Sequence, residues 1–368
     1  MDFVVKKSDL LTELQFVQSV VERRTTVPIL SNLLLETTGN SLSVTATDLD
    51  VTVQCFSPAE IKVSGAVTVS ARKLIDIVRL LPEADIHFKA GSQDWINVTC
   101  QRSRFKLAGL SKDNFPEVPA VNVETVTLPA AALRYMIHHT IFAITQEESR
   151  YTLNGALLLL QPNRLTCVTT DGHRLALITH DCDIEGIAED VRILVPKKTL
   201  SELSKLSSEE LKTVEFGHSE NHLFFRVGDR LLVSRILTGQ FPNYEMVIPK
   251  GNDREVRVGT AEFSDALRRV AVMADEESRS VRFAFSAGQV DISSVSAEFG
   301  EAKESLPAEF QGEQLEIGFN ARYLLDFLAG LETEQVLIQL RDQETQGLFR
   351  PSESDAFDYY YVVMPMKI

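Results

Sequence analysis

The chain has 368 residues, with 37 Lys and Arg against 52 Asp and Glu, and a formal net charge of −15. Apolar residues make up 44% and charged residues 24%, which is typical of folded globular proteins and excludes a disordered chain. No apolar run approaches the roughly 18–20 residues of a membrane span, and the start MDFVVKKSDLL lacks the layout of a secretory signal. We therefore expect a cytoplasmic protein of two or three domains with no membrane partner.

A strand followed by an amphipathic helix occurs three times along the chain. The copies read FVVKKSDLLTELQFVQSVV from Phe3, VTLPAAALRYMIHHTIFAI from Val126 and VRVGTAEFSDALRRVAVMA from Val256. Ser8 and Thr260 stand where helix N-caps are expected. The apolar residues of each copy recur with helical spacing on one face, namely Leu10, Leu14, Val17 and Val21, then Leu133, Ile137, Ile141 and Ile144, then Phe263, Leu267 and Val270.

A second strand-and-helix element repeats at nearly the same interval. Its copies are VTVSARKLIDIVRLL, ILVPKKTLSELSKL and IGFNARYLLDFLAGL. Leu74, Leu200 and Leu324 take the same place in the three copies and lie 126 and 124 residues apart.

The strands between these helices repeat as well. LSVTATDLDVTVQ from Leu42 and LTCVTTDGHRLALIT from Leu165 match at an offset of 123 residues, and two later segments close on Phe115-Pro116 and Phe241-Pro242. Alternating apolar residues separated by polar turns predict antiparallel hairpins. The period is too long for a solenoid. We therefore predict an α+β chain of three similar domains, each with two helices packed on antiparallel sheets, at residues 1–124, 125–253 and 254–368.

Catalytic and metal-binding patterns are weak in this sequence. The cysteines Cys55, Cys100, Cys167 and Cys182 are scattered without ligand spacing, and no nucleotide-binding or nucleophile motif occurs. We expect no cofactor, no metal and no catalytic activity. One alternative stays open, a hydrolase centred on Asp171 and His173, although a lone His beside an Asp is more often structural.

The charge is distributed unevenly along the chain. The six predicted helices with their flanks carry 14 basic and eight acidic residues, a net charge of +6, which leaves −21 on the remainder. If these helices line one surface, an acidic protein still presents a positive wall to phosphates. The alternative is that these are ordinary solvated helix faces on a three-domain scaffold without DNA function.

Several stretches now identify a family. They are TVPILSNLLLE at 26–36, TATDLDVTV at 45–53, RYTLNGALL at 150–158, TTDGHRLAL at 169–177, GQFPNYEMVIPK at 239–250 and the terminal YVVMPMKI. In these stretches, and over its whole length, the chain resembles the beta subunit of bacterial DNA polymerase III, the replicative sliding clamp.

The resemblance implies the DNA-clamp fold and a head-to-tail homodimer that closes a ring around duplex DNA, without reading its sequence. Such a ring tethers the polymerase and so confers processivity. The implied partners are a separate clamp loader, the DNA polymerase III alpha subunit, and other DNA polymerases and repair proteins, which bind through a short peptide motif.

The family's peptide pocket is implied, by matching positions, at Leu153, Thr170, Gly172, His173, Arg174, Leu175, Pro242, Met246, Val247, Val362, Val363, Met364, Pro365 and Met366. Apolar side chains anchor such a peptide, and flexible Met side chains suit several partners. Met246 stands where the family often has Arg, so the rim of this pocket is expected to be more apolar.

Two further surfaces are implied. DNA contacts are expected at Arg24, Arg72, Lys73, Tyr151, Lys197, Lys198 and Lys250, where Arg72 and Lys73 follow from the charge of the helices. The dimer interface is expected to pair Arg102, Arg104, Phe105 and Leu107 of one subunit with Val272, Met273, Glu298, Glu301 and Glu304 of the other. That arrangement frames an apolar centre with opposite charges.

Overall fold

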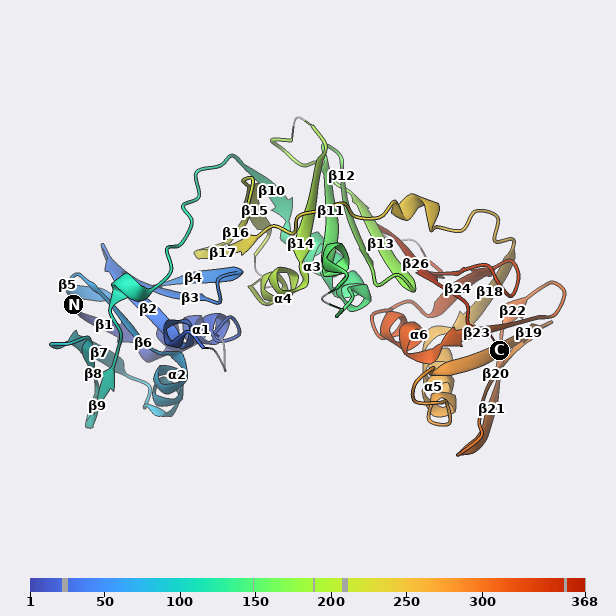
Figure 1. The fold of residues 1–368 in the computed structure, drawn as a ribbon, viewed down its shortest axis with the longest axis horizontal. Coiled ribbons are helices and arrows are strands. Elements are labelled where there is room, and N and C mark those ends of the chain that lie inside the picture. The colour runs from blue at the N-terminus through green and yellow to red at the C-terminus, as the bar shows by residue number, and fades with distance from the viewer. Residues whose placement is uncertain (22–25, 148, 188, 207–210, 354–355, 368) are drawn as a thin grey trace. The chain divides into compact units, whose positions relative to one another are not determined.

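The computed structural model describes residues 1–21, 26–147, 149–187, 189–206, 211–353 and 356–367 (Figure 1). The chain divides into two compact units: Met1–Arg134 with Lys198–Ile236, and Tyr135–Lys197 with Leu237–Ile368. The chain changes unit three times: within helix α3 (Ala130–Thr140), at the start of helix α4 (Lys197–Leu206) and after Ile236. The three-domain division at 1–124, 125–253 and 254–368 concerns the repeats and stays a prediction.

The first unit contains two antiparallel sheets. The five-stranded sheet has the order β5-β1-β7-β8-β9, and the eight-stranded sheet has the order β10-β15-β16-β17-β4-β3-β2-β6. The strands of the first sheet are β1 Asp2–Lys6, β5 Glu60–Val63, β7 Asp85–Ala90, β8 Trp95–Cys100 and β9 Ser103–Ala108. Those of the second are β2 Asn32–Thr38, β3 Ser41–Thr47, β4 Val51–Pro58, β6 Ala66–Ser70, β10 Thr125–Pro129, β15 Thr213–His218, β16 His222–Val227 and β17 Arg230–Arg235.

Helices α1 (Lys7–Val17) and α2 (Ala71–Leu80) pack against each other and against these strands (Figure 1). Leu10, Leu14 and Val17 of α1 are fully buried, as their helical spacing predicts. Val20 is buried after the end of the helix, and Val21 is only partly buried. The predicted apolar face is therefore confirmed as far as Val17.

The second unit also contains two antiparallel sheets. Their orders are β14-β11-β12-β13-β26-β25-β24-β18-β22 and β21-β20-β19-β23. The nine strands of the larger sheet are β11 Gly155–Gln161, β12 Arg164–Thr170, β13 Arg174–Asp181, β14 Val191–Pro196, β18 Arg254–Gly259, β22 Glu309–Phe310, β24 Gln335–Leu340, β25 Gly347–Pro351 and β26 Phe357–Val363. The four of the smaller sheet are β19 Ser280–Ser286, β20 Gln289–Ser296, β21 Gly300–Pro307 and β23 Leu315–Asn320.

Aromatic side chains fill the core of the second unit beside helices α5 (Thr260–Ala271) and α6 (Ala321–Leu328). The rings of Phe327 and Tyr361 stack with centroids 4.8 Å apart, and Phe349 packs edge-on against Phe327. The spacing of apolar residues in α5 predicted its buried face correctly, since Phe263 and Leu267 are buried.

The two predicted N-caps are wrong. Helix α1 begins at Lys7 with Lys6 as its cap residue, and α5 begins at Thr260 with Gly259 as its cap residue. Neither cap residue bonds through a side chain. The strands β1 and β18 run directly into these helices, so no turn is present that could place a Ser or Thr at the cap position.

The described residues also form short 3₁₀ turns, η1 Pro28–Ser31, η2 Lys112–Asn114, η3 Ile141–Ala143, η4 Tyr151–Leu153 and η5 Tyr244–Met246. Among the helices described, none has both the length and the apolar character needed to cross a membrane.

Candidate functional site

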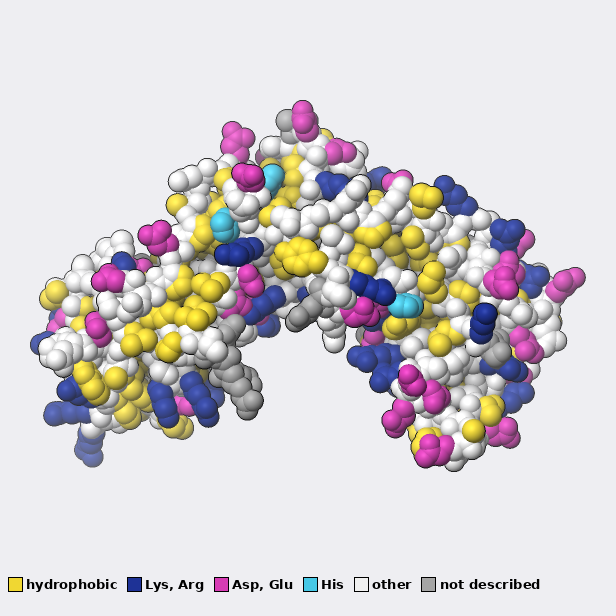
Figure 2. Space-filling view, viewed as in Figure 1, with side chains coloured by type: hydrophobic (Ala, Val, Ile, Leu, Met, Phe, Trp, Pro, Cys, Tyr) yellow, Lys and Arg dark blue, Asp and Glu magenta, His cyan; other side chains and the backbone are white. Residues whose placement is uncertain are grey.

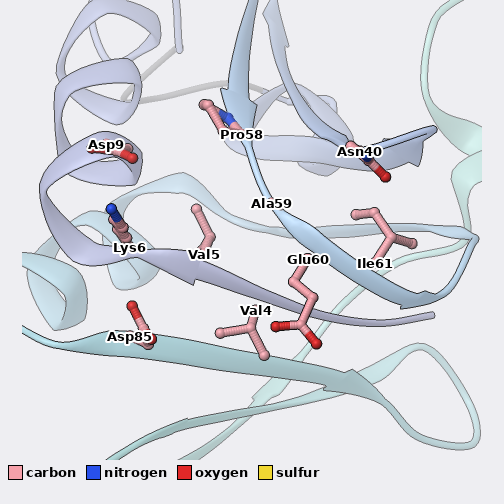
Figure 3. Close-up of a pocket in the computed structure, with 10 residues that line it drawn as sticks. All are labelled: Val4, Val5, Lys6, Asp9, Asn40, Pro58, Ala59, Glu60, Ile61 and Asp85. Carbon is pink, nitrogen blue, oxygen red and sulfur yellow. The ribbon is translucent and has the colours of Figure 1, made fainter.

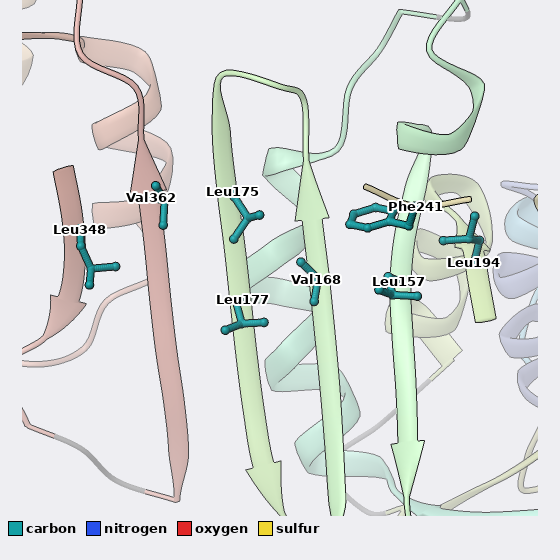
Figure 4. Close-up of a cluster of buried hydrophobic side chains, with 8 residues drawn as sticks. All are labelled: Leu157, Val168, Leu175, Leu177, Leu194, Phe241, Leu348 and Val362. Atoms are coloured by element: carbon teal, nitrogen blue, oxygen red, sulfur yellow. The ribbon is translucent and has the colours of Figure 1, made fainter. Parts of the chain in front are cut away.

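An apolar surface crosses six strands of the second unit (Figure 4). The chain after Phe241 partly covers it, because Tyr244 and Ile248 pack against its residues. Two rows of cross-strand partners build it. One row runs from Leu194 through Leu157 and Val168 to Leu177, and the other runs from Leu175 through Val362 to Leu348. Because side chains alternate along a strand, partners in a row point to the same face of the sheet.

A tight turn between β12 and β13 borders this surface. The Asp171 carboxylate accepts hydrogen bonds from the backbone N–H groups of His173 and Arg174, each at 3.0 Å. Gly172 has φ +91°, and a Cβ there would lie 2.6 Å from Nη1 of Arg150. Arg150 in turn donates to the Asp171 carbonyl at 2.7 Å. Glycine is therefore required by both the backbone conformation and the available space.

The C-terminal strand β26 and the residues after it form the neighbouring wall. Val362 pairs with Leu175, and the Met364 N–H donates to the His173 carbonyl at 2.9 Å. The Met364 side chain is 43% exposed. Met366 instead bridges to Gly318 and is only partly exposed.

The third wall is the η5 turn, which follows Phe241 and Pro242. Tyr244 packs against the apolar rows, and burial raises the pKa of its hydroxyl. Met246 is 82% exposed and Val247 is 36% exposed. An apolar surface with exposed Met and Val at its border has the composition of a site that binds apolar peptide side chains.

Apart from Met366, which bridges to Gly318, the predicted pocket residues separate into two groups. Those at the apolar surface or its border are Leu153, Thr170, Gly172, His173, Leu175, Pro242, Met246, Val247, Val362, Met364 and Pro365. Arg174 and its cross-strand partner Val363 lie on the opposite face of the sheet and are buried there.

On that opposite face, Arg174 of β13 connects the turn before this strand with helix α6. Its guanidinium contacts Asp171 at 2.9 Å, Asp326 of α6 at 2.7 Å and the Phe142 carbonyl at 2.7 Å. It also lies 4.3 Å from the ring centre of Tyr323. Burial alone would lower the pKa of Arg174, but Tyr361, Asp326 and Asp171 raise it above its ordinary value. Arg174 therefore positions the turn from behind.

Sequence reasoning missed several residues of this site. Tyr244 and Ile248 pack against the apolar rows, as does Tyr360, and Arg150 supports the turn. The repeated Phe-Pro pair was a usable signal for Phe241, which is buried against Leu157 in the same cluster (Figure 4). No local pattern marked the others, because their roles depend on contacts between distant segments.

The residues predicted to contact DNA fall in both units. In the first unit Arg72 and Lys73 are exposed in the first turn of α2, and Lys198 forms an ion pair with the buried Asp48. In the second unit Tyr151 is 51% exposed and Lys250 is exposed. Lys197 is partly buried and its ammonium donates to the Ile144 carbonyl at 3.4 Å, and burial lowers its pKa. Arg24 lies outside the described residues.

The residues predicted for the dimer interface lie on or beside two edge strands and at the end of helix α5. Val272 and Met273 follow α5, and Glu298 lies in the turn between β20 and β21. Arg102 precedes β9, and Arg104, Phe105 and Leu107 lie on it, at one edge of the five-stranded sheet. In the other unit Glu301 and Glu304 lie on β21, at one edge of the four-stranded sheet. Glu304 is held by Arg269 in two hydrogen bonds of 2.6 and 2.7 Å.

The two edges differ in charge. Figure 2 shows Lys and Arg side chains over β9 and α2 of the first unit, and Asp and Glu side chains around β20 and β21 of the second. Apolar side chains are exposed in both regions: Phe105 on β9 is 37% exposed, and Val272 at the C-terminal end of α5 is 77% exposed. Val295 and Phe299, which are 75% and 55% exposed, extend the second patch and were not predicted.

Asp171, one of the two residues of the hydrolase alternative, has structural partners in its own turn and in Arg174. The Asp171 carboxylate is bound by two backbone N–H groups and by Arg174. No cluster of three His, Cys, Asp or Glu residues suited to a metal occurs among the described residues. A cavity of about 620 Å³ in the first unit carries Lys6, Asp9, Glu60 and Asp85 beside apolar residues (Figure 3).

Comparisons with known proteins show which family the chain belongs to. The family models for the N-terminal, central and C-terminal domains of the DNA polymerase III beta subunit match residues 1–119, 127–243 and 245–367. A beta sliding clamp of Pseudomonas putida is 40% identical, with all of both chains covered.

Solved structures show the same likeness. The DNA polymerase III subunit beta from Pseudomonas aeruginosa, bound to griselimycin, superposes with a TM-score of 0.95 at 37% identity. The sliding clamp from Caulobacter crescentus gives 0.92 at 35% identity, and both comparisons cover all of both chains. The chain belongs to the DNA polymerase III beta subunit family, whose members are DNA sliding clamps.

Proposed function

We propose that two copies of this chain close head to tail into a ring around duplex DNA and slide along it without reading its sequence. The observation that carries the proposal is the pair of complementary sheet edges, a basic β9 edge in one unit and an acidic β21 edge in the other. Unpaired strand edges readily pair with another chain, and opposite charges fix which edges meet.

Within such a ring, Arg72, Lys73, Lys198, Lys250 and Tyr151 are the candidate DNA contacts, together with Lys197 and Arg24. A modest positive lining attracts phosphates but is screened by salt, which favours sliding over tight binding. The predicted charge of +6 on the helices supports this role.

The apolar surface of the second unit is the proposed peptide pocket for the polymerase and other DNA-processing partners. The DNA polymerase III alpha subunit, other polymerases, repair proteins and a clamp loader are the partners we expect. The protein itself would have no catalytic activity, so a separate loader must open the ring. Because bacterial chromosomal DNA lies in the cytoplasm, we place the protein there.

The ring is tested by retention on DNA. After loading, the protein should co-elute with a nicked circular plasmid on a sizing column at moderate salt, and it should be lost once the plasmid is cut. Light scattering should give about twice 41.1 kDa. A monomer, or equal retention on circular and linear DNA by a proven dimer with a working loader, would contradict the ring.

A pair of matched variants locates the interface. Phe105→Asp places a charge on the β9 edge and should abolish both dimer and retention. Val63→Asp alters an exposed side chain, 55% accessible, on β5 at the other edge of the same sheet, and should change neither. If both variants behave alike, the β9 edge is not the interface.

The peptide pocket is tested with griselimycin, which is bound by the related clamp from Pseudomonas aeruginosa. Val247→Asp should weaken its binding at least tenfold, because a charge at the border opposes burial of an apolar ligand. Val63→Asp, an equally drastic change at an exposed position of β5, should leave this binding unchanged. Equal loss in both variants would argue against the pocket.

A further inference from the structure

A second, smaller cavity lies in the first unit where β4 and β17 pair. It has a volume of about 190 Å³ and is bordered by Leu49, Thr52, Val233 and the chain after Phe115. We propose that this cavity is a second peptide-binding site, which takes one small apolar side chain of a partner segment that carries a basic residue beside it.

The turn at this cavity repeats the turn at the peptide pocket. Asp48 and Asp171 are separated by the repeat offset of 123 residues. The carboxylate of Asp48 accepts from the N–H groups of Asp50 and Val51 at 3.0 and 2.7 Å, as that of Asp171 does from the residues two and three positions later. Leu49 stands in place of Gly172, and it too has a positive φ, of 81°.

The neighbouring strand repeats in register. Thr52 pairs with Val233 in the first unit, and its repeat counterpart Leu175 pairs with Val362 in the second. One residue further on, Ser234 pairs with Val51 as Val363 pairs with Arg174. The cavity is therefore bordered at the same repeat positions as the proposed pocket.

The segment after Phe115, beside the junction of β4 with β17, is also similar to its counterpart at the larger site. Pro116 follows the buried Phe115 and lines the cavity, just as Pro242 follows the buried Phe241 at the larger site. Beyond it Val118 packs against the buried cluster of Phe224, Leu231 and Val233 of the same unit. This segment therefore forms a wall and leaves the cavity open.

The size and charge of the cavity select its occupant. Thr52 replaces the Leu175 of the larger site, and the Thr47 and Thr52 hydroxyls bond each other at 2.8 Å, so the floor is smaller and more polar. About 190 Å³ accommodates one Leu or Val side chain. Two residues with exposed carboxylates, Asp50 and Glu117, line the cavity, against one with an exposed guanidinium, Arg235. This excess, on a chain of net charge −15, favours a basic neighbour to the apolar anchor.

The test uses the full-length dimer with labelled Leu and Val methyl groups and the peptide acetyl-Gly-Lys-Leu-Lys-Gly-amide. A single shallow anchor predicts a Kd of about 1 mM. The methyl signals of Leu49 and Val233 should shift and saturate. Replacing the peptide Leu by Gly, or both Lys by Glu, should weaken binding at least tenfold.

A matched pair of charge reversals locates the site. Asp50→Lys should weaken the peptide at least tenfold, because it turns attraction of the basic side chain into repulsion. Glu124→Lys reverses an exposed carboxylate of the same connecting segment outside the cavity, and should change Kd less than twofold. No saturable shift of Leu49 and Val233 up to 10 mM peptide, or equal effects of the two variants, would overturn the proposal.

The proposal rests on the peptide pocket of the second unit only through the repeat, and the same spectra separate the two sites. Shifts at Leu175 and Val362 that griselimycin removes report the larger site. Shifts at Leu49 and Val233 that survive griselimycin support the second site, even if the larger pocket does not bind peptides. Loss of the Leu49 shifts with griselimycin would mean that they were indirect, and would overturn it.

Discussion

Two strand junctions can be compared, that of β4 with β17 in the first unit and that of β13 with β26 in the second. Both have the same kind of acidic turn, but different side chains bind the turn. In the first, Asp48 of the turn pairs with Lys198 of helix α4. In the second, Arg174 follows the turn and gathers both Asp171 and Asp326 of helix α6. The acidic turn therefore lies at the same repeat position in both units, but it pairs with a Lys in the first unit and with an Arg in the second.

The first junction has an arginine of its own at another place. Arg230 of β17 makes two hydrogen bonds of 2.9 Å with Glu13 of α1 and lies 3.6 Å above the ring of Phe16. It contacts one acidic side chain where Arg174 contacts two. The second junction therefore depends more heavily on a single residue.

Loss of either arginine gives the largest expected effect. Arg174→Met should lower the free energy of unfolding of the second unit by about 3 kcal/mol, because it leaves two carboxylates without their partner. Arg230→Met should cost the first unit about 1–2 kcal/mol, since Glu13 alone loses its partner. The measurement is urea unfolding, followed for the first unit by the fluorescence of Trp95, the single Trp of the chain, and for the second by hydrogen exchange.

The control is Arg226→Met, which removes an exposed pair with Glu215 at 3.6 Å and should cost no more than about 0.5 kcal/mol. If Arg230→Met costs the first unit as much as Arg174→Met costs the second, the two junctions are equally dependent on their arginines and the contrast fails.

The turn residue gives the next effect, and its sign should differ between the junctions. Gly172→Ala should destabilise by about 2 kcal/mol, because φ is +91° and the new Cβ would meet Arg150. Leu49→Gly should stabilise by about 0.5 kcal/mol, because it removes a left-handed conformation of a side-chain-bearing residue at φ 81°. Thermal unfolding of both variants measures the two effects. If Leu49→Gly is destabilised, the Leu49 side chain stabilises the fold by more than the backbone strain costs.

The sequence predicted the repeats and the helix faces, because both depend on local spacing. It did not predict how Arg174 is used, because strand alternation turns that side chain away from Leu175 toward a helix 152 residues later in the chain. The pairing of Arg230 with Glu13 spans 217 residues and leaves no local pattern. The N-caps were wrong because strands run directly into helices there.

Lowering the pH should destabilise the second unit more than the first, because the second unit contains the buried His139. Its ring contacts the Tyr135 and Gly330 carbonyls at 2.8 and 2.7 Å. Burial lowers its pKa below the ordinary value of 6.5, against the opposing effect of those carbonyls, and His138 and Glu332 are the nearby charged groups. The unfolded chain therefore binds the proton more readily. The stability this residue contributes is complete above about pH 6.5 and is lost as the pH falls through the lower folded pKa.

We expect the second unit to lose stability relative to the first as the pH falls from 7.5 to 5.5. Hydrogen exchange in the two units at both pH values measures the difference. His139→Gln should remove most of this pH dependence, and an unchanged dependence in that variant would assign it to other groups.

The smallest expected effect concerns the borders of the two cavities. Counting from the repeated Phe-Pro pairs, Ala120 in the first unit corresponds to Met246 in the second. Met246→Ala should therefore make the border of the second cavity like that of the first. It should weaken the binding of griselimycin about threefold, which is about 0.6 kcal/mol, because one flexible apolar contact is lost. Ala120→Met is the reciprocal change and should leave griselimycin binding unaltered, while it strengthens binding of the Lys-Leu-Lys peptide at the smaller cavity. If Met246→Ala has no effect, the 82% exposed thioether does not take part in binding, and specificity lies with Val247, Met364 and the apolar rows behind them.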